Sequence, residues 1–189
     1  MTLIWIIILL TIVVALIFDV INGFHDAANS IATVVSTRVL TPRVAVLWAA
    51  FFNFVAMFVF APKVAQTISS IVHITPNDHS FVFVVLAGLI GAIIWDLMTW
   101  WWGLPTSSSH ALIGGFVGAG IAHSGLSGIN WGKVFKTIEY IPLAPLIGFV
   151  IGFIIMTAVY WVFRRCRPGT VDHHFRRLQL VSAALYYLR

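Results

Sequence analysis

The stretch Asp19-Val20-Ile21-Asn22-Gly23-Phe24-His25-Asp26-Ala27-Ala28-Asn29-Ser30 sets two acids, two amides and a histidine at the end of an apolar segment that begins at Leu3. A segment of that kind is typical of a membrane span, where an acid costs several kcal/mol unless it faces a polar cavity or a bound cation. On an unbroken helix the acids and amides share one face, within an arc of roughly 80°. These residues are Asp19, Asn22, Asp26 and Asn29. The stretch therefore predicts a functional site inside a membrane protein.

The composition supports a membrane protein over a soluble domain. Hydrophobic residues make up 60% of the chain, charged residues 9%, and the mean hydropathy is +1.00, which is too high for an ordinary soluble core. No basic residue precedes the first apolar run and no small-residue cleavage site follows it, so we expect this segment to be retained rather than removed as a signal peptide. The single cysteine, Cys166, excludes an internal disulfide and a cysteine-based metal site.

The net charge of +5 raises the question of nucleic-acid binding. The basic residues, however, cluster directly after an apolar segment, where positive charge marks the cytoplasmic side of a membrane protein. The cluster consists of Arg164, Arg165, Arg167, Arg176 and Arg177. We therefore expect no nucleic-acid partner and attribute the basicity to membrane topology.

The hydropathy pattern predicts an all-α, polytopic membrane protein. Residues 1–163 form its transmembrane part, and residues 164–189 form a cytoplasmic basic tail that leads into the beginning of a further span. The apolar segments are approximately 3–21, 44–61, 81–102, 105–123 and 141–163, close to the roughly 20 residues that cross a bilayer. The segment 105–123 is rich in glycine and begins with Pro105 and serines, so it is expected to be a broken or re-entrant helix.

The distribution of basic residues also predicts the orientation. It places the N-terminus outside and the C-terminus inside the cell, in the inner or plasma membrane.

An outer loop contains His73, Asn77, Asp78 and His79. Because these residues crowd a turn built on Pro76, a solvated loop is favoured there over a metal site. The tryptophans are expected to form interfacial belts rather than a ligand cage. They are Trp95, Trp100, Trp101, Trp102 and Trp131.

The second informative stretch is Gly103-Leu104-Pro105-Thr106-Ser107-Ser108-Ser109-His110-Ala111-Leu112-Ile113-Gly114-Gly115. Pro105 is expected to break or start a helix, and the hydroxyl residues from Thr106 to Ser109 can cap the half-helix that follows. The N-terminus of a discontinuous helix inside a membrane attracts an anionic substrate, because its dipole and free amides replace water around the charge. The alternative is that the serines only pack helices together.

Together, the two stretches resemble the inorganic phosphate transporter (PiT) family. Its first signature, G-x-x-D-x-x-N, is matched by Gly23, Asp26 and Asn29, and its G-L-P-x-S-S-S-H stretch is matched from Gly103 to His110. The resemblance implies a symporter that takes up inorganic phosphate with a coupling cation, built from two inverted repeats with the site at their interface. It implies no other cofactor, and it implies a homo-oligomer for the complete protein.

The resemblance also suggests roles for the site residues. Asp26 and Asn29 would contribute to the central site and its cation, and Ser107, Ser108 and Ser109 would bind phosphate oxygens. We add Thr106 and Asn29 to the expected phosphate site, and Asn22 and Asp96 to the expected cation site, since an intramembrane acid such as Asp96 is functional by default. An acid with an amide suits either H⁺ or Na⁺, and the substrate is either free phosphate or a metal–phosphate complex.

The chain differs from a complete family member because it holds one signature and one serine-rich stretch. It is expected to be the N-terminal half of a transporter, one repeat that needs a missing C-terminal half or a second chain, from a truncated frame or a split gene. A non-transporting remnant or accessory subunit is the alternative.

A further alternative is an intramembrane hydrolase with Ser109 as nucleophile, His110 as base and Asp96 as the orienting acid. Adjacent residues on a helix point about 100° apart, and the serines lie in no G-x-S-x-G turn. We therefore expect the chain not to be an enzyme.

Overall fold

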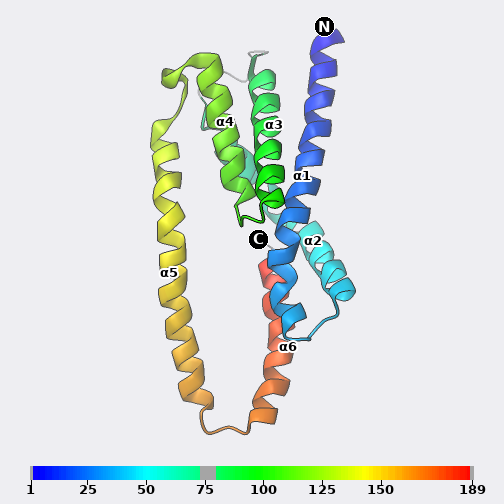
Figure 1. The fold of residues 1–189 in the computed structure, drawn as a ribbon, viewed down its shortest axis with the longest axis vertical. Coiled ribbons are helices and arrows are strands. Elements are labelled where there is room, and N and C mark those ends of the chain that lie inside the picture. The colour runs from blue at the N-terminus through cyan, green and yellow to red at the C-terminus, as the bar shows by residue number, and fades with distance from the viewer. Residues whose placement is uncertain (1, 73–79, 188–189) are drawn as a thin grey trace. The chain divides into compact units, whose positions relative to one another are not determined.

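The computed structural model describes residues 2–72 and 80–187, without the side chains of residues 2, 26–30, 56–57, 59–69 and 186–187. The described chain is helical, which confirms the predicted all-α class (Figure 1). Its helices are α1 (Thr2–Ser36), α2 (Pro42–Ser69), α3 (Ser80–Trp101), α4 (Ser108–Ser124), the short 3₁₀ turn η1 (Leu126–Gly128), α5 (Trp131–Phe163) and α6 (Pro168–Tyr187). The predicted outer-loop residues His73, Asn77, Asp78 and His79 lie outside the described residues.

Three of the described helical segments are long and apolar enough to cross a membrane: Leu3–His25, Ser80–Trp101 and Trp131–Phe163. Pro42–Val55 is a shorter apolar helix. Helix α1 continues well past the predicted segment 3–21, and α5 begins well before the predicted segment 141–163 and ends with it. By contrast, α4 has only 17 residues and follows a non-helical segment, so the predicted break at the start of 105–123 is present.

The chain divides into two compact units. The first consists of residues 1–29 and 59–131, and the second of residues 30–58 and 132–189. Helix α1 contributes its longer part to the first unit and its last turns to the second. Because α1 runs from Thr2 to Ser36, the polar stretch 19–30 lies on one continuous helix. The predicted shared face of its acids and amides requires such a helix.

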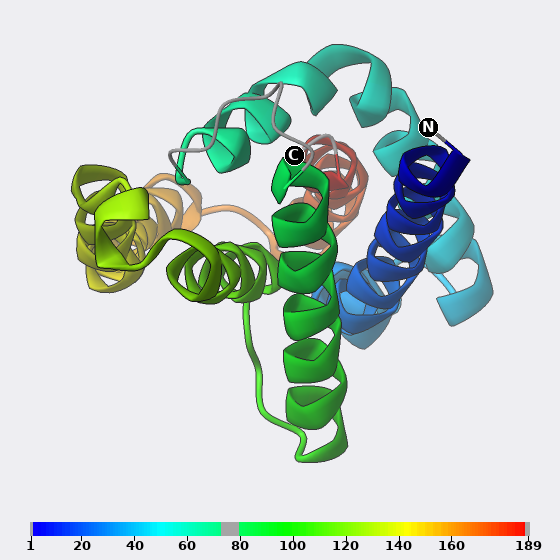
Figure 2. The ribbon, with the colours of Figure 1, turned by 90° about the horizontal axis from the view of Figure 1, so that it is seen from above.

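In the first unit, α3 and α4 lie side by side with their backbones in direct contact (Figures 1 and 2). A Cβ atom built on Gly115 would overlap the carbonyl oxygen of Gly88, and a Cβ on Gly88 would lie 3.2 Å from the amide nitrogen of Phe116. Small residues allow such close approach between membrane helices. Helix α1 packs here through Phe18, which forms a buried cluster with Leu89 and Ala92 of α3.

The far end of α4 is held by the segments before α3 and after η1. Val72 and Ile129 form an isolated β-bridge, and the amide of Asn130 donates to the carbonyl of Ile71 at 2.8 Å. A Cβ on Gly120 would lie 2.7 Å from the Ile129 side chain. The C-terminal end of α4 is therefore fixed within the first unit.

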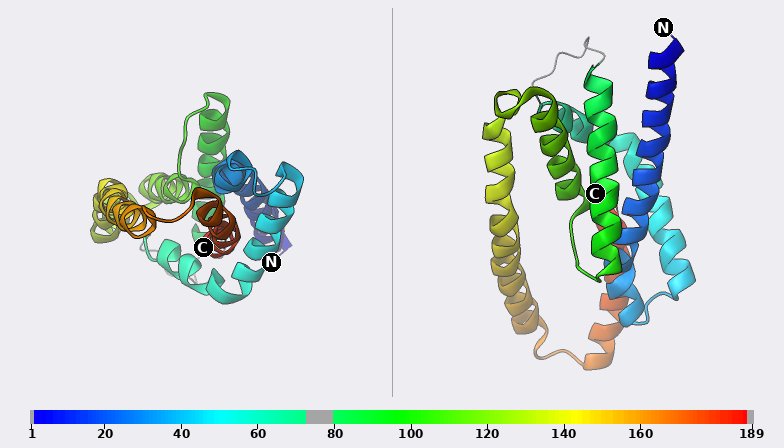
Figure 3. Two further views of the ribbon diagram at one scale, coloured as in Figure 1. Left: turned by 90° about the horizontal axis from the view of Figure 1, so that it is seen from below. Right: turned by 45° about the horizontal axis from the view of Figure 1, so that its top comes forward.

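In the second unit, the segment predicted as a basic tail forms helix α6. Its Ala183 joins a buried cluster with Val34 of α1 and with Ala45 and Ala49 of α2. The helices α5 and α6 run antiparallel and are joined by a short turn after Phe163 (Figures 1 and 3). The Phe163 and Phe175 rings meet edge to face there, 5.2 Å apart.

Helix α5 has two unusual features. It carries Pro142 and Pro145 in its interior. Its side chains are almost all exposed, and none of the residues in its most apolar window is buried within the described structure. A long apolar helix exposed on all sides fits a lipid environment.

Candidate functional site

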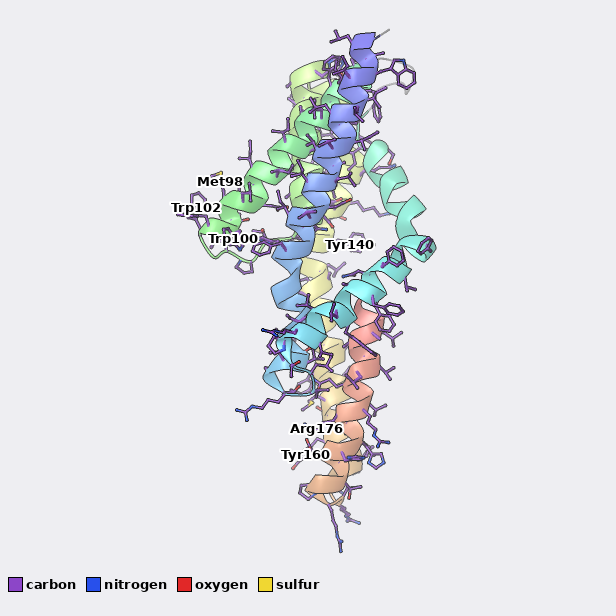
Figure 4. All side chains as sticks on the ribbon, turned by 90° about the vertical axis from the view of Figure 1, so that its right-hand side faces the viewer. Met98, Trp100, Trp102, Tyr140, Tyr160 and Arg176 are labelled. Carbon is purple, nitrogen blue, oxygen red and sulfur yellow. The ribbon has the colours of Figure 1, made fainter. Side chains whose placement is uncertain are left out.

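The connection between α3 and α4 turns back along α3 instead of leaving it. The amides of Trp102 and Gly103 donate to the carbonyls of Met98 and Trp100, at 3.1 and 3.0 Å, which closes the helix. Gly103 then adopts φ +66°, a left-handed conformation that favours glycine at a helix C-terminus. Met98, Trp100 and Trp102 lie at this end of α3 (Figure 4). The glycine therefore sends the chain back toward the last turns of the helix.

Thr99 holds the returning segment. Its backbone carbonyl accepts a hydrogen bond from the amide of Leu104 at 2.8 Å. Its hydroxyl oxygen lies 3.1 Å from the hydroxyl oxygen of Thr106. Residues 102–107, hereafter the returning loop, are thus bonded to one residue of α3 through both its backbone and its side chain.

Buried polar side chains gather at this junction. Asp96 is 0% exposed, Thr99 1% and Ser108 3%, and of the described residues only Thr11 is another buried polar side chain. The hydroxyl of Ser108 has no hydrogen-bond partner among the described residues. Because an unbonded buried hydroxyl costs free energy in an apolar surrounding, this hydroxyl is a candidate to meet a polar ligand.

Helix α4 begins at the returning loop with an open N-terminus. Ser107 is the N-cap residue, with φ −99° and ψ 117°, and its side chain makes no capping hydrogen bond. The first helical bond joins the amide of Ala111 to the carbonyl of Ser107 at 3.0 Å. The amides of Ser108, Ser109 and His110 therefore have no carbonyl partner within the helix. The prediction that a serine caps α4 is correct in position, but the serine hydroxyl does not form the capping bond.

A cavity of about 550 Å³ opens beside this N-terminus. Its lining comes from α3, the returning loop and the first turns of α4, all within the first unit. The lining residues are Gly91, Trp95, Thr106, Ser107, His110, Ala111, Gly114 and Gly115. Mostly apolar walls with a few hydroxyls and a helix N-terminus suit a small anion, because the amides and the helix dipole favour negative charge.

The cavity brings together only part of the predicted phosphate site. Thr106 and Ser107 line it, whereas the buried Ser108 and the exposed Ser109 are not among the lining residues. The alternative was that the serines pack the helices together. At the contact between α3 and α4 the small residues are glycines, Gly88 and Gly115, and Gly115 also lines the cavity. Ser107 is a lining residue of the cavity.

The predicted cation residues lie on two helices. Asp96 is completely buried on α3, while Asn22 is half-buried and Asp19 is exposed on α1. Asp26 and Asn29 also belong to α1, but their side chains are outside the described part of the structure. Among the described residues, no three His, Cys, Asp or Glu side chains gather in a way that could hold a metal ion.

Of the tryptophans expected in interfacial belts, Trp95 is one of the residues that line the cavity, and the belts themselves stay a prediction. Trp100 instead contacts Phe24 of α1, with ring centroids 5.4 Å apart, and Trp131 donates from its indole nitrogen to the carbonyl of Leu126 at 2.8 Å. Sequence reasoning also missed Thr99. The available signal was its spacing from Asp96, since residues three apart lie on one face of a helix.

Comparison with known proteins identifies the family. The model of the phosphate transporter family matches residues 22–188. The chain belongs to the phosphate transporter family. This membership confirms the resemblance that the two signature stretches carry, and it makes the chain an integral membrane protein.

Individual phosphate transporters of the family are close in sequence. The probable low-affinity inorganic phosphate transporter of Rhizobium meliloti (strain 1021) is 52% identical over 181 residues, which cover 94% of this chain and 52% of the relative. The protein of the same description from Streptomyces halstedii is 49% identical over 178 residues, covering 94% of this chain and 82% of the relative.

A solved structure described as the sodium-dependent phosphate transporter matches with a TM-score of 0.75 and 26% identity, over 100% of this chain and 54% of that one. The chain thus spans about half the length of the Rhizobium relative and of this phosphate transporter. These relatives are described as phosphate transporters and not as enzymes, which confirms the expectation that the chain is not an enzyme.

Proposed function

We propose that the chain takes part in cation-coupled uptake of inorganic phosphate across the cell's inner or plasma membrane. The observation that carries this proposal is the cavity at the N-terminus of α4, which has Thr106 and Ser107 among its lining residues. Relatives described as inorganic phosphate transporters support the choice of anion. Phosphate oxygens can accept several hydrogen bonds at once from a cluster of donors such as this one.

The phosphate site would work by replacing water with fixed donors. Hydroxyls of Thr106 and Ser107 would donate to two phosphate oxygens, and the amides at the start of α4 would stabilise the charge. The buried hydroxyl of Ser108, which has no partner among the described residues, would supply a further donor after a rotation about its side-chain bond. Ser109 and Asn29 complete the proposed phosphate set, and free phosphate is the simplest substrate.

The coupling cation would be held by carboxylate and amide oxygens. We assign Asp26, Asn29, Asn22 and Asp96 to this role. An anion and buried carboxylates in one membrane site repel each other, and a cation between them removes that repulsion. Similarity to a sodium-dependent phosphate transporter supports Na⁺ over H⁺. On this view Asp26→Asn abolishes concentrative uptake while leaving membrane insertion intact, because an amide costs less than a carboxylate in hydrocarbon.

The chain is proposed to supply one of the two repeats of an inverted-repeat transporter, with the N-terminus outside and the C-terminus inside. Support comes from its length, which is about half that of the Rhizobium relative. The other part of the site would come from a C-terminal half or a second chain. The same length supports a second candidate function, a non-transporting accessory subunit.

Uptake in a strain that lacks its own phosphate transporters separates these candidates. We would express the chain alone, and also with the C-terminal half of the Rhizobium transporter, and confirm by immunoblot that it is in the membrane. We expect saturable, Na⁺-dependent uptake of labelled phosphate only in the second case. No uptake with either arrangement favours the accessory subunit, while uptake by the chain alone points to two oppositely inserted copies.

Alanine substitutions then test the phosphate site. A hydrogen bond to a charged ligand contributes about 1.5–3 kcal/mol, or roughly 10- to 150-fold in affinity. We expect the largest loss of phosphate affinity for Ser107→Ala, with Ser108→Ala and Ser109→Ala measured beside it. Ser182→Ala on the exposed face of α6 is the control. Unchanged affinity in all three serine variants would show that the anion site lies elsewhere.

A further inference from the structure

We propose that Thr99 is a positioning residue that fixes the returning loop, so that Thr106 and Ser107 line the cavity. The effect of Thr99 on phosphate affinity rests on the proposed function. The attachment of the loop by Thr99 does not depend on that function. Thr99 itself does not line the cavity and is 1% exposed. It would therefore act on a ligand only through Thr106 and the loop.

The first support is that Thr99 makes two separate bonds to the loop. Its carbonyl accepts from the amide of Leu104 at 2.8 Å, and its hydroxyl lies 3.1 Å from that of Thr106. The two attachments are on either side of Pro105, whose ring restricts the backbone between them. The position of the segment that enters α4 is therefore defined relative to the last turn of α3.

The second support is a comparison with other threonines in the apolar helices. Thr11 and Thr157 also bond their hydroxyls to the carbonyl four residues earlier, at 2.8 Å in both cases. Thr99 makes the same bond to Trp95 at 2.9 Å. Of these three, only Thr99 has a further contact to another segment, which is the one to Thr106. Satisfying its own hydroxyl within the helix thus does not explain the contact.

The hydroxyl pair also has a directional consequence. Each hydroxyl has one proton. While Thr99 donates to the Trp95 carbonyl, the hydroxyl of Thr106 must donate to that of Thr99. The Thr106 oxygen can then only accept a hydrogen bond from a further group. When an anion enters the cavity, Thr106 can donate to it, and Thr99 can redirect its proton to Thr106. The pair therefore keeps the loop attached in both states while making a donor available to the anion.

Hydrogen exchange of the returning loop tests the attachment without any ligand. The full chain in lipid nanodiscs is compared with Thr99→Val, which keeps the shape but removes the hydroxyl, and with Thr99→Ser, which keeps the hydroxyl. Thr157→Val is the matched control. A neutral hydrogen bond corresponds to roughly a 2- to 12-fold change in an equilibrium. We expect exchange in residues 102–107 to rise by that factor in Thr99→Val and to return close to wild type in Thr99→Ser.

Phosphate binding to the same samples gives the second readout. We expect Thr99→Val and Thr106→Val each to weaken binding of labelled phosphate, and the double variant to be no weaker than the worse single one, because both changes remove the same bond. Additive losses, or wild-type exchange of the loop in Thr99→Val, would overturn the inference. If the wild-type chain binds no phosphate while the loop loosens as expected, the attachment stands and the proposed phosphate site fails. Should Thr99→Val not fold, Thr106→Val tests the bond from the other side.

Discussion

The side-chain amide of Gln179 on α6 donates a hydrogen bond to the backbone carbonyl of Thr33 in the last turns of α1, at 3.1 Å. The other end of the same amide lies 3.1 Å from the Thr37 hydroxyl, and Arg176 reaches the Thr37 carbonyl at 3.4 Å. The Thr33 carbonyl also accepts from the amide of Thr37 at 3.2 Å, and carbonyls at a helix C-terminus carry partial negative charge. Helix α6 thus stabilises the end of the helix that carries the acid-and-amide stretch.

This contact predicts a definite order among Gln179 variants. Gln179→Leu should lower the free energy of unfolding by about 1–3 kcal/mol, the net contribution of its two neutral hydrogen bonds. Gln179→Glu should be worse, because a negative charge at a helix C-terminus is unfavourable, and Gln179→Lys should be better than either. Thermal unfolding of the purified chain gives the order directly. Equal melting temperatures for the Glu and Lys variants would contradict the assignment.

The contact of α3 with α4 predicts that Gly115→Ala is strongly destabilising. The new methyl group would overlap the Gly88 carbonyl, and forcing extra volume into such a contact costs about 1–3 kcal/mol. Gly118→Ala on the same helix is the matched control, because nothing lies within 4 Å of the position of its Cβ. We expect a lower melting temperature only for Gly115→Ala. If Gly118→Ala lowers the melting temperature as much, the loss of stability does not come from the contact with Gly88.

The burial of Asp96 predicts that its substitution affects phosphate uptake but not membrane insertion. It is completely buried on an apolar helix, so Asp96→Asn should leave membrane insertion intact or improve it. Loss of the charge should reduce Na⁺-dependent phosphate uptake by roughly tenfold or more in the co-expressed transporter, since bonds to charged groups are the strong ones. Asp172→Asn on exposed α6 is the control. Wild-type Na⁺ dependence in Asp96→Asn would remove this acid from the cation site.

The proposed orientation is tested through the single cysteine. Cys166 is exposed in the turn after α5, whereas Leu126 is exposed before its start. A membrane-impermeant maleimide should label Cys166 only after the cells are permeabilised. In a variant with Cys166→Ser and Leu126→Cys it should label intact cells. The reverse pattern would place the N-terminus inside.

The sequence was sufficient to predict features that depend on neighbouring residues. Asp19 to Ser30 fall on one helix because nothing in that run interrupts it, and Pro105 lies in the non-helical segment before α4, where it disfavours a continuous helix. The serine stretch also starts α4, with Ser107 at the N-cap. In each case the determining chemistry lies within a few residues of the feature.

Features that depend on contacts between distant segments could not be predicted. Gln179 and Thr33 are 146 positions apart, and nothing around either residue indicates its partner. Thr99 resembles Thr11 and Thr157 in sequence, and its contact to Thr106 arises only because Gly103 turns the loop back. The glycines of segment 105–123 indicated a broken or re-entrant helix, and the contact of Gly115 with Gly88 depends on how α3 and α4 align.

Helix α5 contains two prolines, Pro142 and Pro145. Each lacks the amide proton that would bond the carbonyl four residues earlier, so the carbonyls of Ile138 and Ile141 receive no bond from these prolines. A helix bends at such a point with little loss of backbone bonding. Helix α5 therefore resists bending less around Pro142 and Pro145 than elsewhere along its length.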